Sequence, residues 1–126
     1  MEYLHSDITS EVLNAFYEVY NELGAGFLEK VYQNALFNEL RQRGIPCQKE
    51  HPISVYYKGA CVGDYYADIL IDNKIILELK AVKNILPEHL AQLTNYLRAT
   101  DAEVGLLLNF GVEPQHKRIV FTNDRK

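Results

Sequence analysis

Two acidic residues and one lysine interrupt an otherwise apolar stretch of the chain, which reads ADILIDNKIILELKA from Ala67 to Ala81. Asp68 lies near the start of this stretch, and Glu78 and Lys80 lie near its end. Carboxylate oxygens are ligands that Mg²⁺ prefers, and a lysine ammonium is a compact positive charge that can bind a phosphate group. If the fold brings these three side chains together, they form a candidate site for a divalent cation and a phosphate.

The apolar residues of this stretch alternate with the others, which predicts a hairpin with a defined register. One strand is expected from about 62 to 71, a turn at 72–74, and a second strand from 75 to 82. The register that joins apolar residues to apolar partners pairs Ile71 with Ile75, Ile69 with Leu77, and Ala67 with Leu79. The same register places Asp68 directly opposite Glu78 on the other face of the sheet, with Lys80 two residues further along.

Two carboxylates in these positions repel each other and call for a cation. Directly opposed side chains have Cβ atoms about 4.5–5.5 Å apart, a separation at which like charges are destabilising. Lys80 can compensate in part, and Mg²⁺ would compensate better because it binds carboxylate oxygens at ~2.0–2.1 Å and keeps bound waters. The alternative is an ordinary solvated face of an antiparallel sheet, on which Asp, Glu and Lys are expected.

Helices and further strands are expected on both sides of the hairpin. Apolar residues recur at helical spacing in two early segments, and Pro87 suits the first turn of a third helix. The expected order is helix 6–23, helix 27–43, strand 52–57, the hairpin, helix 87–99, strand 103–110 and strand 118–121. The second helix is expected to bury Leu28, Val31, Tyr32, Ala35, Leu36 and Leu40. A strand, helix, strand crossover should be parallel, so the predicted fold is α/β with a mixed sheet flanked by helices.

Two of the predicted helices carry polar residues that could face the hairpin. GFLEKVY contains Glu29 and Tyr32, which lie three residues apart on neighbouring positions of the second helix. QLTNY contains Gln92 and Tyr96, which share one face of the third helix. Taken singly, the glutamate and the glutamine could equally be solvated surface residues, and Tyr96 could be a half-buried residue at the edge of the core.

Together these motifs resemble a known superfamily. Asp68 and Glu78-x-Lys80 on a hairpin, followed by Gln92-x-x-x-Tyr96 on a helix, resemble the PD-(D/E)XK nucleases and their RecB-like branch. The stretch Gly26-x-x-Glu29-x-x-Tyr32 is similar to the signature of the GxxExxY family, a group of small bacterial proteins in the same superfamily. The resemblance runs from about residue 8 to residue 121. The chain departs from the pattern at Ala67, where the superfamily name has proline.

The resemblance implies a fold and a set of roles. It implies a restriction-endonuclease-like αβββαβ core, which agrees with the order of elements expected from the residues. Asp68 and Glu78 would ligate Mg²⁺ or Mn²⁺, with Glu29 as an additional acidic ligand. Lys80 would orient or help deprotonate the attacking water and neutralise charge on the phosphate. Gln92 and Tyr96 would brace the site or contact the phosphate backbone.

Composition narrows the class of protein. The chain has 126 residues, which favours a single domain over residues 1–126. A net charge of −4 argues against nucleic-acid binding through a bulk positive field. Four scattered histidines and two distant cysteines give no zinc motif, and the cysteines are expected to be reduced thiols. We expect no signal peptide and no membrane-spanning segment, and therefore a cytoplasmic protein.

Three functions remain open from the sequence. The first is a Mg²⁺- or Mn²⁺-dependent nuclease that acts on DNA or on RNA. The second is a non-catalytic module that keeps the fold and binds nucleic acid or a protein, and the third is a hydrolase of a small phosphate-containing molecule. No separate recognition element is evident, so specific cutting would need a homodimer or a partner protein. Four tyrosines on two strands could stack on bases, form a dimer face, or pack in the sheet: Tyr56, Tyr57, Tyr65 and Tyr66.

Overall fold

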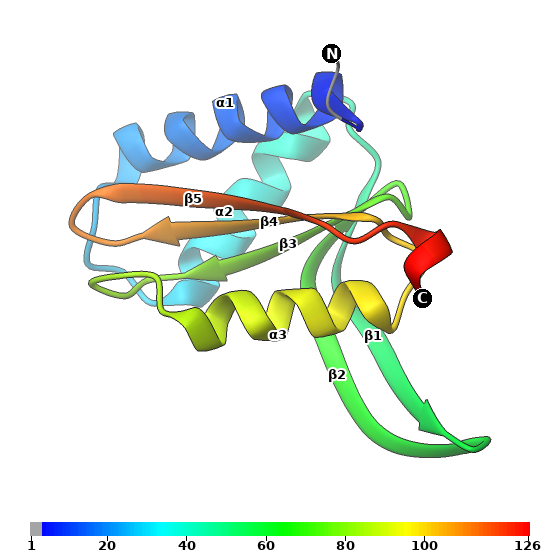
Figure 1. Cartoon of the computed structure of the whole chain (residues 1–126). Coiled ribbons are helices and arrows are strands. Elements are labelled where there is room, and N and C mark those ends of the chain that lie inside the picture. Colours follow the sequence, from blue (N-terminus) through cyan, green and yellow to red (C-terminus); the bar gives the residue numbers. More distant parts are fainter. Residues whose placement is uncertain (1–3) are drawn as a thin grey trace.

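A computed structural model describes residues 4–126 as a five-stranded sheet with helices on both faces (Figure 1). The strands lie in the order β1-β2-β3-β4-β5. The elements along the chain are α1 (Ser6–Leu23), α2 (Glu29–Gln42), β1 (Cys47–Tyr57), β2 (Ala60–Ile71), β3 (Ile75–Lys80), α3 (Pro87–Arg98), β4 (Val104–Phe110), β5 (Pro114–Val120) and the short 3₁₀ helix η1 (Asn123–Arg125). Within the described residues, no helix combines the length and the hydropathy needed to cross a membrane.

The topology confirms the predicted fold class. Strands β1, β2 and β3 form an antiparallel meander, β3 and β4 are parallel, and β5 is antiparallel to β4. The ends of several elements differ from the prediction. Strand β1 begins at Cys47 rather than at Pro52, and β5 begins at Pro114 rather than at Arg118. Helix α2 begins at Glu29 because Leu28 has extended backbone angles, φ −72° and ψ 155°.

The two faces of the sheet bury separate apolar clusters. Helices α1 and α2 cover one face, where Phe16, Tyr32 and Leu36 pack against residues from β2, β3 and β4. Helix α3 covers the other face, where Leu93 and Leu97 pack against Ile76 and other sheet residues. Burial on both faces explains why β4 is a continuous apolar run without alternation.

The expectation that Leu28 and Val31 are core residues is wrong. Leu28 is 80% exposed and Val31 is 40% exposed, whereas Tyr32, Leu36 and Leu40 are fully buried and Ala35 is partly buried. Helix α2 starts one residue after Leu28, so this side chain lies on the turn that enters the helix and does not reach the sheet. The buried stripe is therefore narrower than the run of apolar residues suggested.

Strands β1 and β2 form a long hairpin that curves away from the other three strands, past the end of α3 (Figure 1). The bend changes the face to which β2 residues belong. Ile69 packs in the cluster beneath α1 and α2, as expected, but Ala67 packs in the cluster beneath α3. The prediction that these two residues share one face is wrong, because the strand turns at the residue between them, Asp68.

The segment that follows β3 is held by a buried asparagine on β4. Asn109 is 0% exposed and pairs with Lys80 across the parallel ladder. Its side-chain oxygen accepts a hydrogen bond from Val82 N–H at 3.0 Å, and its amide nitrogen donates to the Val82 carbonyl at 2.9 Å. These two bonds fix the chain just beyond Lys80 and so define where β3 ends.

Candidate active site

Asp68 and Glu78 meet where the backbone ladder between β2 and β3 stops. The last ladder pair is Ile69 with Leu77. At the next position, side chains replace the backbone acceptors: Asp68 N–H donates to Glu78 Oε1 at 3.1 Å, and Leu79 N–H donates to Asp68 Oδ2 at 2.8 Å. Each acid thus accepts the amide of the opposite strand with one carboxylate oxygen, and the two carboxyl groups also interact directly with each other. The predicted opposition of these two residues agrees with this geometry.

Burial makes both carboxylates difficult to ionise together. Glu78 is 5% exposed, and burial followed by the charge of Asp68 raises its pKa to about 9. Burial also raises the pKa of Asp68, which the hydrogen bond from Leu79 N–H partly opposes. Two acids that cannot both be charged in a buried pair are a common feature of catalytic and cation-binding sites.

Lys80 provides positive charge near the pair without neutralising it. The side chain is half-buried, and its charge acts to lower the pKa of both Asp68 and Glu78. Among the described residues, however, neither carboxylate has an ion pair within 4 Å. The ammonium of Lys80 is therefore available to a third group, such as a phosphate oxygen.

The donor set fits a hard divalent cation. Mg²⁺ is commonly held by one or two carboxylates, with waters and substrate phosphates completing its coordination. Asp68 and Glu78 supply two such carboxylates. No group of three or more His, Cys, Asp or Glu side chains lies close enough to hold one ion within the described residues. Glu29 acts on the pKa of Asp68 through its charge but is not part of a preformed three-carboxylate cluster, and its role as a ligand stays a prediction.

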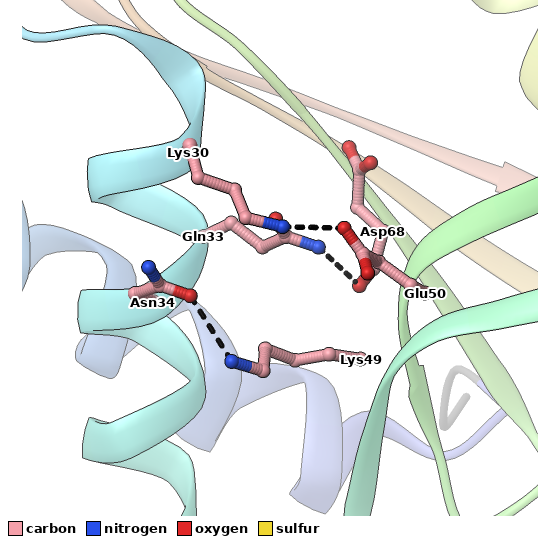
Figure 2. Close-up of polar contacts among 6 residues, drawn as sticks. All are labelled: Lys30, Gln33, Asn34, Lys49, Glu50 and Asp68. Carbon is pink, nitrogen blue, oxygen red and sulfur yellow. Dashed lines mark hydrogen bonds and ion pairs between the residues drawn. The ribbon is translucent and has the colours of Figure 1, made fainter.

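Gln33 is a buried residue of this site that the sequence analysis missed. Its side chain is 6% exposed, and its amide nitrogen donates to the Asp68 backbone carbonyl at 3.0 Å. Figure 2 shows the side chain reaching from α2 to Asp68. The backbone N–H of Asp68 is bound by Glu78, so both polar backbone groups of Asp68 have side-chain partners rather than ladder partners. A glutamine four residues after Glu29 gives no signal in the sequence that would separate it from a surface residue.

Two further contacts hold α2 against β1 beside this point (Figure 2). Lys30 forms an ion pair with Glu50, and Lys49 donates to the Asn34 side-chain oxygen at 3.1 Å. Glu50 has a left-handed backbone, φ 52°, at the position opposite Asp68 on β1. The irregular backbone on β1 and the missing ladder pair on β3 therefore flank the same residue.

Tyr32 holds the turn between α1 and α2, and through it the start of α2. Its hydroxyl donates to the Gly24 carbonyl at 2.5 Å and accepts from Phe27 N–H at 3.2 Å. Its ring stacks on Phe110, with centroids 4.3 Å apart. The tyrosine of the GxxExxY stretch is thus a core residue that fixes the turn from which Glu29 emerges.

Tyr96 and Gln92 lie on the same side of α3 but differ in burial. Tyr96 is 7% exposed, and burial followed by the charges of Glu78 and Asp68 raises the pKa of its hydroxyl to about 12. Gln92 is exposed. Both line a groove between α3 and the β1–β2 hairpin. The structure therefore brings Asp68, Glu78, Lys80 and Tyr96 together and leaves Gln92 and Glu29 at the margin.

Comparison with known proteins finds a family whose sequence model spans most of the chain. The sequence model of the PD-(D/E)XK nuclease superfamily matches residues 6–119. No curated protein matches the chain with significant sequence similarity.

Two solved structures share the fold. One is the crystal structure of SSO0001, with 23% sequence identity and a TM-score of 0.61 over 77% of this chain and 52% of that chain. The other is an alkaline exonuclease (LHK-Exo) from Laribacter hongkongensis, with 12% identity and a TM-score of 0.54 over 75% of this chain and 56% of that one. The chain spans about half the length of the structures that it matches.

The raised pKa of Glu78 predicts how the stability of the metal-free protein depends on pH. The folded chain keeps this proton up to about pH 9, whereas the unfolded chain loses it near the ordinary value of 4.5. Rising pH across this window therefore favours the unfolded state, and thermal unfolding in EDTA should show a falling Tm. Glu78→Gln should flatten the fall, and Glu18→Gln, an exposed control on α1, should not. An equal fall in wild type and Glu78→Gln would contradict this account.

Removing the amide of Gln33 should weaken the site as well as the fold. Gln33→Met keeps the length of the side chain but leaves the Asp68 carbonyl buried without its partner, at a cost of about 1–3 kcal/mol in the free energy of unfolding. Affinity for Mn²⁺, measured by calorimetry on the folded variant, should fall by about 10- to 100-fold, as for other residues that orient a ligand. Asn38→Ala, an exposed control on α2, should change neither quantity. Unchanged Mn²⁺ affinity in Gln33→Met would show that the bond is only structural.

Proposed function

The chain belongs to the PD-(D/E)XK nuclease superfamily, and from this premise we propose that it hydrolyses phosphodiester bonds in nucleic acid, most directly DNA, at Asp68 and Glu78. The observation that carries the proposal is the opposed pair of a buried glutamate, Glu78, and a half-buried aspartate, Asp68, which lacks a paired cation within the described residues. Such a pair needs a divalent cation, Mg²⁺ or Mn²⁺, before a polyanion can approach it. RNA is the second substrate to test.

Hydrolysis requires a positioned water and stabilisation of the charge that develops on the phosphate. A divalent ion, when bound, supplies Lewis acidity and lowers the pKa of a bound water. In this proposal Asp68 and Glu78 hold the ion, and their backbone hydrogen bonds keep the carboxylates from turning away. Lys80 donates to the phosphate or orients the water, because its ammonium is near the carboxylates and is not paired with either of them.

Three further residues, Tyr96, Gln92 and Glu29, have supporting roles in the proposal. The Tyr96 hydroxyl lies within range of the charges of the two acids, and its raised pKa keeps it protonated at neutral pH, so it can donate a hydrogen bond but cannot act as a base. Gln92 lies on the outer part of the same helix face and could contact the phosphate backbone. Glu29, whose charge acts on Asp68, would join the cation through a bound water or on substrate binding.

Loss of the acid at position 78 should abolish cleavage without loss of the fold. Glu78→Gln keeps the shape of the side chain and should lower the rate of Mg²⁺-dependent cleavage by at least ~10²- to 10³-fold, since both cation binding and charge stabilisation depend on it. Lys80→Ala should lower the rate by about 10²- to 10⁴-fold. The measurement is cleavage of labelled single- and double-stranded DNA and RNA with Mg²⁺, with Mn²⁺ and with EDTA.

The controls separate a lost site from a lost fold. Glu18→Gln should cut as well as wild type, and each variant should unfold cooperatively. Cleavage by a folded Glu78→Gln variant at the wild-type rate would overturn the proposal. Binding of nucleic acid by wild type, without cleavage under any metal condition, would instead favour a non-catalytic module that keeps the nuclease fold.

A further inference from the structure

A groove of about 690 Å³ lies between α3 and the curved hairpin of β1 and β2. The hairpin wall includes Tyr56, Val62 and Tyr65, and the helix wall includes Gln92 and Asn95. In Figure 1 the hairpin leaves the sheet and bends past the end of α3, which separates the two walls. The volume of the groove falls within the range of about 300–1,000 Å³ that is usual for ligand-binding sites.

Four tyrosines of the hairpin are exposed, which excludes core packing as the reason for their presence. Tyr56 is 67% exposed, Tyr57 62%, Tyr65 46% and Tyr66 61%. Of these four hairpin tyrosines, Tyr56 and Tyr65 line the groove, and Tyr57 and Tyr66 do not. Exposed aromatic rings beside a groove are the surfaces on which unpaired bases stack, and such stacking tolerates any base because every base has a flat face.

The polar lining favours bases over the backbone of a duplex. The groove carries one basic residue and one acidic residue, Arg98 and Glu88, so its formal charge is balanced. Duplex binding depends on several Lys or Arg contacts to phosphates, which this lining does not provide. Two carboxamides, Gln92 and Asn95, offer both donors and acceptors that can pair with the edges of an unstacked base.

The groove and the candidate active site share one residue, Tyr96. Tyr96 lines the groove, and its ring lies 5.7 Å from the ring of Tyr65. The same Tyr96 hydroxyl is close enough to Glu78 and Asp68 to respond to their charges. Tyr65 also precedes Asp68 by only three residues on β2. A strand lying in the groove would therefore run toward the two carboxylates.

We propose that this groove binds unpaired nucleotides of a single-stranded nucleic acid by stacking bases on Tyr56 and Tyr65, and thereby leads a single strand or a frayed end to the active site. The inference rests on the proposed function, since it names the form of substrate for that site. The alternative occupant of the groove is a second copy of this chain. The carboxamides of Gln92 and Asn95 favour a nucleic-acid base over a second copy, because they can pair with the edge of a base.

The test measures binding separately from cleavage. In the Glu78→Gln background and in EDTA, no cleavage can occur, and a labelled oligothymidine of about 10 nucleotides serves as the probe for fluorescence anisotropy. Tyr56→Ala should weaken binding about tenfold, which corresponds to the loss of one stacked base. Tyr57→Ala and Tyr66→Ala are matched controls, because these tyrosines are equally exposed on the same hairpin but do not line the groove. They should change affinity less than twofold.

Further probes identify what the groove recognises. An abasic oligonucleotide of the same length keeps the phosphates but lacks the bases. Its affinity for the protein with Tyr56 intact should be no higher than the affinity of oligothymidine for Tyr56→Ala. A duplex should also bind weakly, and an oligouridine arm distinguishes RNA from DNA. The proposal is overturned if Tyr56→Ala and Tyr57→Ala change the affinity for oligothymidine equally, or if the abasic or duplex probe binds as tightly as oligothymidine. It is also overturned if Tyr56→Ala converts a dimer to a monomer, because the groove would then be an interface between two copies of the chain. Failure of wild type to cleave would leave this binding result unaffected.

Discussion

The backbone of Asp68 cannot be satisfied by a regular β-ladder, and the candidate site is built from the groups that replace it. Buried backbone donors and acceptors need partners. Glu78 accepts the Asp68 N–H, Gln33 donates to the Asp68 carbonyl, and the Asp68 carboxylate accepts the amide of Leu79. The two acids are therefore held by the same bonds that terminate the ladder between β2 and β3. Beyond the last ladder pair the hairpin of β1 and β2 curves away from the sheet, and the groove lies between this hairpin and α3.

Helix α2 stabilises this break from the other side of the sheet. Its N-terminal turn is set by Tyr32, which is buried against Phe110 and binds the preceding loop through its hydroxyl. The tyrosine of the GxxExxY stretch thus has a structural role: it fixes the start of α2. The next residue, Gln33, then contacts Asp68 with its buried amide. Function and stability are coupled here, because each acid is both a ladder substitute and a candidate cation ligand.

Alternation of apolar residues was sufficient to predict the register of the central hairpin, because a one-residue slip would have moved Ile69 and Ile71 to the face that carries Asp68 and Glu78. The pairing of Ile71 with Ile75 and of Ile69 with Leu77 is confirmed, as is the mixed sheet. The bend at Asp68 could not be predicted, since it moves Ala67 to the other cluster without any change in the pattern. Gln33 was missed because its burial depends on how α2 docks against the strands, which is a tertiary contact without a local signal. The roles of the site residues remain predictions.

The central claim is that Asp68 and Glu78 together bind a divalent cation, and crystals grown with Mn²⁺ would test it most directly through the anomalous scattering of the metal. The account predicts an anomalous peak in contact with one oxygen of each carboxylate, with the backbone hydrogen bonds to the other oxygens retained, and no peak at this position in Glu78→Gln. A peak elsewhere, or none at saturating Mn²⁺ while both carboxylates keep their backbone partners, would contradict the claim. The pair would then be a structural substitute for the broken ladder and not a catalytic site.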